Sequence, residues 1–104
     1  MSNIFDMSEI NNFDNEVLEE LLSNPKVKIE RIVSTGQVTP EGEWYDQDND
    51  EWLILLEGQA KILFEEGVEI SLQKGTYLHI PARKLHRVTF TSQNPPCIWL
   101  AIHF

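Results

Sequence analysis

The chain has 104 residues, a formal net charge of −9 at pH 7 and one cysteine, Cys97. This length fits a single domain, and the acidic excess opposes the phosphate contacts that dominate binding to nucleic acid or to an anionic membrane. One cysteine cannot form an intramolecular disulfide, which fits a reducing compartment, and its place after Pro95-Pro96 at the start of an apolar run predicts a buried structural thiol.

Residues 1–25 are predicted to form an N-terminal segment that contains one short helix, over residues 14–24. Asp14 or Asn15 would be its N-cap, and Pro25 would end it because the residue before a proline avoids the helical region. Its apolar face would comprise Val17, Leu18, Leu21 and Leu22. The first residues lack a positively charged start followed by an apolar run, so no secretory signal is expected and a cytoplasmic protein is predicted.

Residues 26–104 are predicted to be all β-structure. Short apolar stretches alternate with turn-rich ones, and the strands are expected in KVKIERIVS, WLILLEGQAKILF, VEISL, TYLHIP, HRVTFTS and CIWLAIHF. The WLILLEGQAKILF stretch reads as two strands joined at residues 57–59, and an irregularity is expected at Arg31. Six or seven short strands at even spacing are typical of a small sandwich or barrel. The apolar runs are far shorter than the roughly 20 residues that cross a bilayer.

Two glycine-bounded segments resemble the two motifs of the cupin family. Glu51 stands seven residues before Gly58, as in the second half of the first motif, and GTYLHIPARKLHRVTF keeps Gly75, Pro81 and His86 at the spacing of the second. The resemblance covers residues 26–104. It implies a double-stranded β-helix, or jelly roll, with a metal or small-molecule site inside. We expect the N-terminal helix to pack on the outside of this barrel.

The sequence departs from the family pattern at several motif positions. Tyr45 and Gln47 stand where the first motif has two histidines, or Trp44 and Asp46 in the longer register of that motif. Arg83 replaces the glycine of the second motif and Phe90 replaces its asparagine. By resemblance, the four-ligand set of the family corresponds to Tyr45, Gln47, Glu51 and His86.

These substitutions leave two interpretations of the interior site open. A divalent transition metal would be held weakly by Gln47, Glu51 and His86, because an amide oxygen is a poor ligand and a phenol must first lose its proton. Alternatively, Glu51 and His86 form a buried hydrogen-bonded pair in an apolar pocket for a small organic ligand. The candidate pocket residues are Tyr45, Gln47, Glu51, His86, Trp52 and Trp99. His86 is also the candidate general base, because a neighbouring carboxylate would make it a better proton acceptor near neutral pH.

The remaining histidines and the basic cluster are weaker candidates. His79 should face away from Leu78 and Ile80 and so be peripheral, whereas His103 either lines the barrel or covers its edge. The aromatic side chains Trp44 and Tyr77 suit a core or a dimer interface as well as a pocket. The basic cluster comprises Arg83, Lys84 and Arg87. We expect these side chains to pair with the acidic residues of 41–51 or to face water, rather than to receive an anionic substrate.

Three functions follow from this sequence. The first is a module that binds a small organic ligand, with or without a weakly held divalent metal. The second is a metal-dependent enzyme of the dioxygenase or isomerase type, and the third is a degenerate cupin that serves as a structural or interaction subunit. A homodimer is expected, with the apolar CIWLAIHF stretch at its interface, because pairing protects strand edges.

Overall fold

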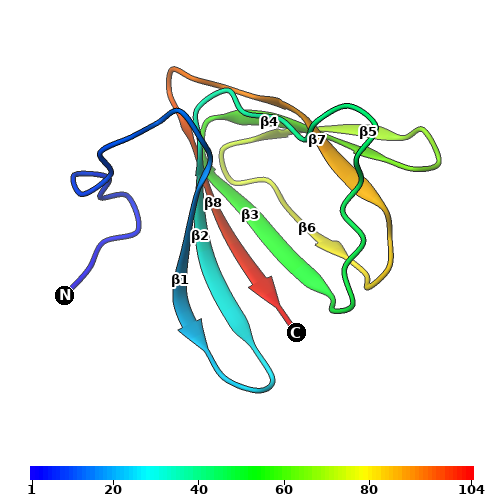
Figure 1. Ribbon diagram of the computed structural model, residues 1–104, viewed down its shortest axis with the longest axis horizontal. Coiled ribbons are helices and arrows are strands. Elements are labelled where there is room, and N and C mark those ends of the chain that lie inside the picture. Colours follow the sequence, from blue (N-terminus) through cyan, green and yellow to red (C-terminus); the bar gives the residue numbers. More distant parts are fainter.

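The computed structural model describes residues 1–104 and contains strands but no helix. In chain order the strands are β1 (Val17–Ser23), β2 (Lys28–Ser34), β3 (Glu51–Glu57), β4 (Gln59–Phe64), β5 (Glu69–Gln73), β6 (Tyr77–Ile80), β7 (His86–Thr91) and β8 (Cys97–His103). They form a five-stranded sheet, β1-β2-β8-β3-β6, and a three-stranded sheet, β5-β4-β7, in which all neighbours are antiparallel (Figure 1). The predicted all-β fold is confirmed.

The core lies between the two sheets, and strand alternation decides which side chains enter it. In β3, Leu53 and Leu55 are buried whereas Trp52 and Ile54, which alternate with them, are only half-buried on the outer face. The same alternation turns Trp99 and other side chains of β8 inward. The buried core cluster comprises Leu53, Leu55, Ala60, Ile62, Phe64, Leu72, Ile80, Cys97, Trp99 and Ala101.

The connection between β3 and β4 passes from one sheet to the other through Gly58. Gly58 has φ +91°, and a Cβ there would lie 2.8 Å from Ser92 Oγ and 2.9 Å from the Cα of Cys97. Only glycine can adopt this positive φ without strain and also fit the space beside Ser92 and Cys97. The Cys97 thiol is fully buried beside this turn and donates a hydrogen bond to the Gln59 carbonyl at 3.1 Å, so the predicted burial of this cysteine is confirmed.

The predicted helix over residues 14–24 is wrong, because this stretch forms β1 at the edge of the five-stranded sheet. A β-bulge between Glu20 and Leu22 shifts the pairing with β2, so the apolar residues on either side of it fall at spacings that mimic a helix. Pro25 lies within the hairpin turn between β1 and β2, where the Asn24 side chain accepts hydrogen bonds from the backbone N–H groups of Lys26 and Val27. The irregularity expected at Arg31 is not found there, because Arg31 pairs in regular register with Glu19 of β1 and Leu100 of β8. The bulge lies in β1 instead.

Arg31 fastens the N-terminal residues to the outer face of the five-stranded sheet. Its guanidinium is buried, donates from Nη1 to the Ile4 carbonyl at 2.9 Å and donates from Nε to Glu19 Oε1 at 2.7 Å. Figure 1 shows this segment beside β1, outside the space between the sheets. None of the elements is a helix with the length and hydropathy needed to cross a bilayer.

Strand β8, which contains the apolar stretch expected at a dimer interface, lies in the middle of its sheet between β2 and β3. Both of its edges are hydrogen-bonded and most of its side chains are buried. It cannot supply an interface by edge pairing. β1 is one of the two edge strands of this sheet, and its Leu21 and Leu22 are about half exposed, at 48% and 53%.

Candidate functional site

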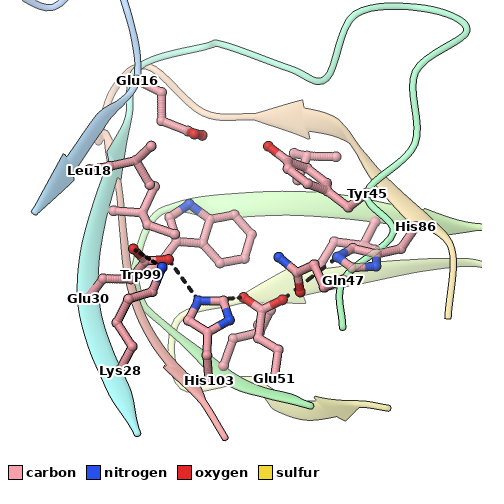
Figure 2. A pocket seen from close by; sticks show the side chains of 14 residues that line it. Glu16, Leu18, Lys28, Glu30, Tyr45, Gln47, Glu51, His86, Trp99 and His103 are labelled. Atoms are coloured by element: carbon pink, nitrogen blue, oxygen red, sulfur yellow. Dashed lines mark hydrogen bonds and ion pairs between the residues drawn. The ribbon is translucent and has the colours of Figure 1, made fainter. Parts of the chain in front are cut away.

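A cavity of about 260 Å³ lies between the two sheets. Figure 2 shows side chains entering it from both sheets and from the segment between β2 and β3. Its lining comprises Glu16, Leu18, Lys28, Glu30, Ile32, Tyr45, Gln47, Glu51, Leu53, Ile62, His86, Val88, Trp99 and His103. Of the six predicted pocket residues, the structure brings all except Trp52 together here.

Trp52 does not reach the cavity, contrary to the prediction. It follows Glu51 in β3, and consecutive side chains of a strand point to opposite faces of the sheet. Because Glu51 points inward, Trp52 lies on the outer face, where it pairs with His79 of β6 and its ring packs at 5.6 Å from the Tyr77 ring.

The segment from residue 35 to residue 50 brings Tyr45 and Gln47 to the cavity because it runs along β7. Tyr45 exchanges backbone hydrogen bonds with His86, and the Gln47 carbonyl accepts a hydrogen bond from the backbone N–H of Arg83. The Tyr45 ring then stacks on the His86 imidazole with ring centroids 5.4 Å apart. Burial, with added repulsion from Glu16, raises the pKa of the Tyr45 hydroxyl, so this phenol stays protonated at neutral pH.

Glu51 is the least compensated charge of the site. Its side chain is buried, with 6% of the residue exposed, and no group donates a hydrogen bond to it. The nearest partners of its carboxylate are His86 Nε2 at 3.8 Å and His103 Nε2 at 4.0 Å. Burial raises the pKa of Glu51, and the two imidazoles oppose this shift only in part.

The ring of His86 is held in one orientation by the backbone. Its Nδ1 lies 2.9 Å from the Lys84 carbonyl oxygen, and because a carbonyl only accepts, Nδ1 carries the proton. In the neutral ring the Nε2 lone pair therefore faces Glu51 and the cavity. The expected hydrogen-bonded pair of Glu51 and His86 is a looser contact than predicted, since 3.8 Å exceeds hydrogen-bond length.

His103 lines the cavity. Of the two positions that the sequence left open for it, the interior of the barrel is therefore correct and the edge is not. Its Nε2 lies 2.8 Å from Glu30 Oε1, and the residue is buried. Lys28 lies 3.8 Å from the other oxygen of Glu30. Three further lining residues were not predicted from the sequence: Glu16, Lys28 and Glu30. The period-two pattern of KIERI, which puts Lys28 and Glu30 on one face with Ile32, was the signal that could have found two of them.

None of the three residues of the basic cluster lines the cavity. Arg83 stands where the second cupin motif has a glycine, and its backbone has a left-handed φ of 67°. Its guanidinium pairs with Asp46 and Asp48. Lys84 pairs with Glu66, and Arg87 donates to the Thr39 carbonyl. The expected pairing with the acidic residues of 41–51 thus holds for Arg83.

His79 is peripheral, as expected. Its side chain is half exposed, pairs with Asp50 at 2.9 Å and stacks on Phe104. It lies on the outer face of the five-stranded sheet opposite Trp52, away from the cavity.

The residues of the cavity do not fit a tightly bound transition metal. No three His, Cys, Asp or Glu side chains converge on one point in the structure. The predicted metal set has two strong donors, Glu51 and His86, and the third, Gln47, offers only an amide. His103 does not complete the set because its Nε2 is engaged by Glu30. The orientation of His86 by a backbone carbonyl does resemble that of many metal-bound histidines.

Comparison with known proteins identifies the family. The family profile described as "Cupin domain" matches residues 31–103, whereas no curated protein sequence matches. A crystal structure from Ralstonia eutropha JMP134, provisionally named a mannose-6-phosphate isomerase, is 38% identical over 99% of this chain and 95% of its own, with a TM-score of 0.91.

More distant structures share the fold. A cupin superfamily protein from Desulfitobacterium hafniense DCB-2 is 20% identical over 90% of this chain and 81% of its own, with a TM-score of 0.77. The Fe(II) protein HppE in complex with substrate is 17% identical over 85% of this chain and 53% of its own, with a TM-score of 0.71. From the strand order, the two motifs and these matches together, we conclude that the chain belongs to the cupin family.

Proposed function

We propose that this protein binds a small polar organic molecule in the cavity between its two sheets. The observation that carries the proposal is Glu51, a buried carboxylate that faces the cavity without a hydrogen-bond donor. Burying an ionised carboxylate without a hydrogen-bonded partner is costly. A ligand that donates a hydrogen bond to Glu51 would recover this cost, while the apolar walls around Trp99 would bury its carbon skeleton.

The form of the cavity favours this proposal over a purely structural role. A degenerate barrel would be expected to fill its interior with aromatic side chains. Here the interior is open, and it is walled by four residues at the ligand positions of the family, Tyr45, Gln47, Glu51 and His86. A structural or interaction subunit has no need of such a space.

A second candidate function is proton transfer on the bound molecule, as in an aldose–ketose isomerase. It is favoured by the geometry of His86, whose Nε2 lone pair faces the cavity beside Glu51 and suits a general base. In such a reaction the base would take a proton from the carbon next to a carbonyl and return it to the neighbouring carbon. The provisional name of the Ralstonia protein lies in the same reaction class.

A phosphorylated sugar is nevertheless a poor match for this cavity. Three carboxylates line it, Glu16, Glu30 and Glu51, against one ammonium group, that of Lys28, which already pairs with Glu30. A phosphate would be repelled by this lining. If the protein is an isomerase, its substrate is expected to be uncharged or cationic.

The metal-dependent alternative is tested by elemental analysis of untagged protein. Because the donor set does not fit, we expect less than about a tenth of an equivalent of any transition metal, before and after incubation with iron, zinc, manganese or nickel. A full equivalent that is lost in His86→Ala, and kept in the peripheral control His79→Ala, would contradict this reading and favour the enzyme.

Binding itself is tested by thermal shift and by fluorescence. A ligand that binds only the folded state raises the melting temperature. The variant with Trp44→Phe and Trp52→Phe leaves Trp99 as the single tryptophan, so a ligand in the cavity should change its emission. The proposal would be refuted if no compound of a chemically broad library raised the melting temperature or changed the emission of Trp99.

A further inference from the structure

The charges around the cavity are unevenly compensated. Glu30 accepts a hydrogen bond from His103 at 2.8 Å and lies 3.8 Å from the ammonium group of Lys28. Lys28 is the one lysine or arginine of the lining. Glu30 is therefore balanced by groups of the protein, and the two other carboxylates of the cavity, Glu16 and Glu51, are not.

Glu51 receives a donor from neither imidazole. The His103 Nε2 proton points to Glu30, which is 2.8 Å away, whereas Glu51 is 4.0 Å away. In neutral His86 the proton is on Nδ1, bonded to the Lys84 carbonyl, so Nε2 presents a lone pair to Glu51. This buried carboxylate therefore has no donor within hydrogen-bond distance, and it faces the cavity.

Glu16 enters the same cavity from the other end. Figure 2 shows its carboxylate and that of Glu51 on opposite sides of the space, with Trp99 between them. A relay of hydrogen bonds orients it: Trp99 Nε1 donates to Ser34 Oγ at 3.2 Å, and Ser34 Oγ donates to Glu16 Oε2 at 3.2 Å. Burial raises the pKa of Glu16, as it does for Glu51.

We propose that the ligand of this cavity is a small organic amine whose ammonium group is bound by Glu51. This inference rests on the proposed binding function and specifies the ligand class. An ammonium group brings up to three donors and the missing positive charge to a carboxylate that has neither. The Trp99 ring in the wall offers an aromatic face to a cation, and Glu16 can hold a second amino or hydroxyl group at the far end.

The charge of the whole protein acts in the same direction. A net charge of −9 attracts cations and repels anions during diffusional encounter. An anionic ligand would instead add charge to a space that contains two uncompensated carboxylates. A neutral alcohol could donate to Glu51 but would leave its charge uncompensated, so it should bind more weakly than the matching amine.

Amine binding has a pH signature. Glu51 faces His86 of β7, His103 of β8, Lys28 and Glu30 of β2, and the Tyr45 hydroxyl. An ammonium group beside Glu51 favours the ionised carboxylate, so binding releases a proton wherever free Glu51 is still protonated. The affinity should therefore rise as pH increases through the elevated pKa of Glu51 and then level off until the amine itself loses its proton.

Calorimetric titration of the full chain with matched pairs of ligands tests the proposal. Putrescine, ethanolamine and benzylamine are compared with butanediol, ethylene glycol and benzyl alcohol, in which hydroxyl groups replace the amino groups, at a salt concentration that screens the exposed acids. We expect at least one amine to bind, and its alcohol to bind at least tenfold more weakly. We also expect Glu51→Gln to lower the amine affinity by at least tenfold, since the substitution removes the charge-assisted hydrogen bond to the ammonium group.

Two variants make the result specific to the cavity. Glu65→Gln removes an exposed carboxylate outside the cavity and should leave amine binding unchanged. Circular dichroism shows whether Glu51→Gln is folded. Glu16→Gln should lower the affinity for putrescine more than the affinity for benzylamine, because benzylamine has no second amino group.

The outcomes separate this inference from the function on which it rests. Equal affinity for amines and alcohols, or amine binding that survives in Glu51→Gln, would overturn the ligand class. The same holds if no amine binds while other compounds of the library stabilise the protein, which would leave the binding function standing. If no compound of any class binds, both proposals are overturned.

Discussion

Replacing Glu51 by glutamine should stabilise the protein at neutral pH. The two side chains have nearly the same shape, but only glutamate places a charge in a buried position that has no hydrogen-bond donor. Such an unsatisfied group costs about 1–3 kcal/mol, and glutamine can turn its amide to donate as well as accept. For a domain of this size, 1 kcal/mol corresponds to about 4–8 °C in melting temperature.

The gain should depend on pH in a defined direction. Burial raises the pKa of Glu51 in the folded protein above its value of about 4.3 in the unfolded chain. Between these two pKa values the folded state binds more protons than the unfolded state, so the wild type loses stability as pH rises through that window. Each unit of pKa difference accounts for about 1.4 kcal/mol. Below the window the wild type is protonated in both states, and the advantage of the glutamine variant should disappear.

Urea unfolding of the wild type and the glutamine variant at a series of pH values between acid and neutral measures this difference directly. Glu65→Gln, an exposed substitution, is the matched control and should show no such trend. A glutamine variant that is less stable than the wild type at neutral pH would show that His86 and His103 compensate the charge fully. A stability difference that does not change with pH would refute the argument from burial.

Three further predictions concern the scaffold. Gly58→Ala should destabilise the protein by more than about 2 kcal/mol in urea unfolding, because it combines a left-handed φ with contacts of 2.8–2.9 Å, whereas Gly42→Ala, with a similar φ in open space, should cost less. Arg31→Met should release the N-terminal residues and make them sensitive to limited proteolysis, whereas unchanged protection would show that other contacts hold them. The homodimer stays a prediction, and we now place its interface at the edge strand β1. The double variant Leu21→Glu with Leu22→Glu should convert a dimer to a monomer in light scattering. A wild type that is monomeric at micromolar concentration would contradict this prediction.

The strands after Pro25 could be predicted because their signals are local. Alternating apolar residues and glycine turns lie within short stretches of sequence, as at Gly58, which separates the last residue of β3 from the first residue of β4. The N-terminal helix could not be excluded in the same way. A single bulge in β1 turned a strand pattern into an apparent helical one, and the partner that decides the matter, β2, is set by the hairpin at Asn24.

The site was predicted only as far as the motif spacing reached. Glu51 and His86 lie at motif positions, and Tyr45 and Gln47 follow by counting back from Glu51. The other polar groups depend on strand register across the sheet, which the spacing does not contain. In that register Lys28 of β2 lies opposite His103 of β8, and His103 lies opposite Glu51 of β3, so three residues far apart in sequence form one row of the cavity lining.

This polar row is the strongest physical argument that the cavity has a function. The parallel row deeper in the same sheet, Ile32, Trp99 and Leu55, continues the core with apolar side chains and needs no compensation. Apolar residues in this polar row would close the sandwich in the same way, and replacing buried charges by apolar side chains is often neutral or stabilising. A purely structural role would also call for complete pairing, yet Glu30 takes the donors of Lys28 and His103 and Glu51 is left with none. The missing donor is most simply supplied by a bound molecule, because local interactions that oppose folding are expected where a protein binds or reacts.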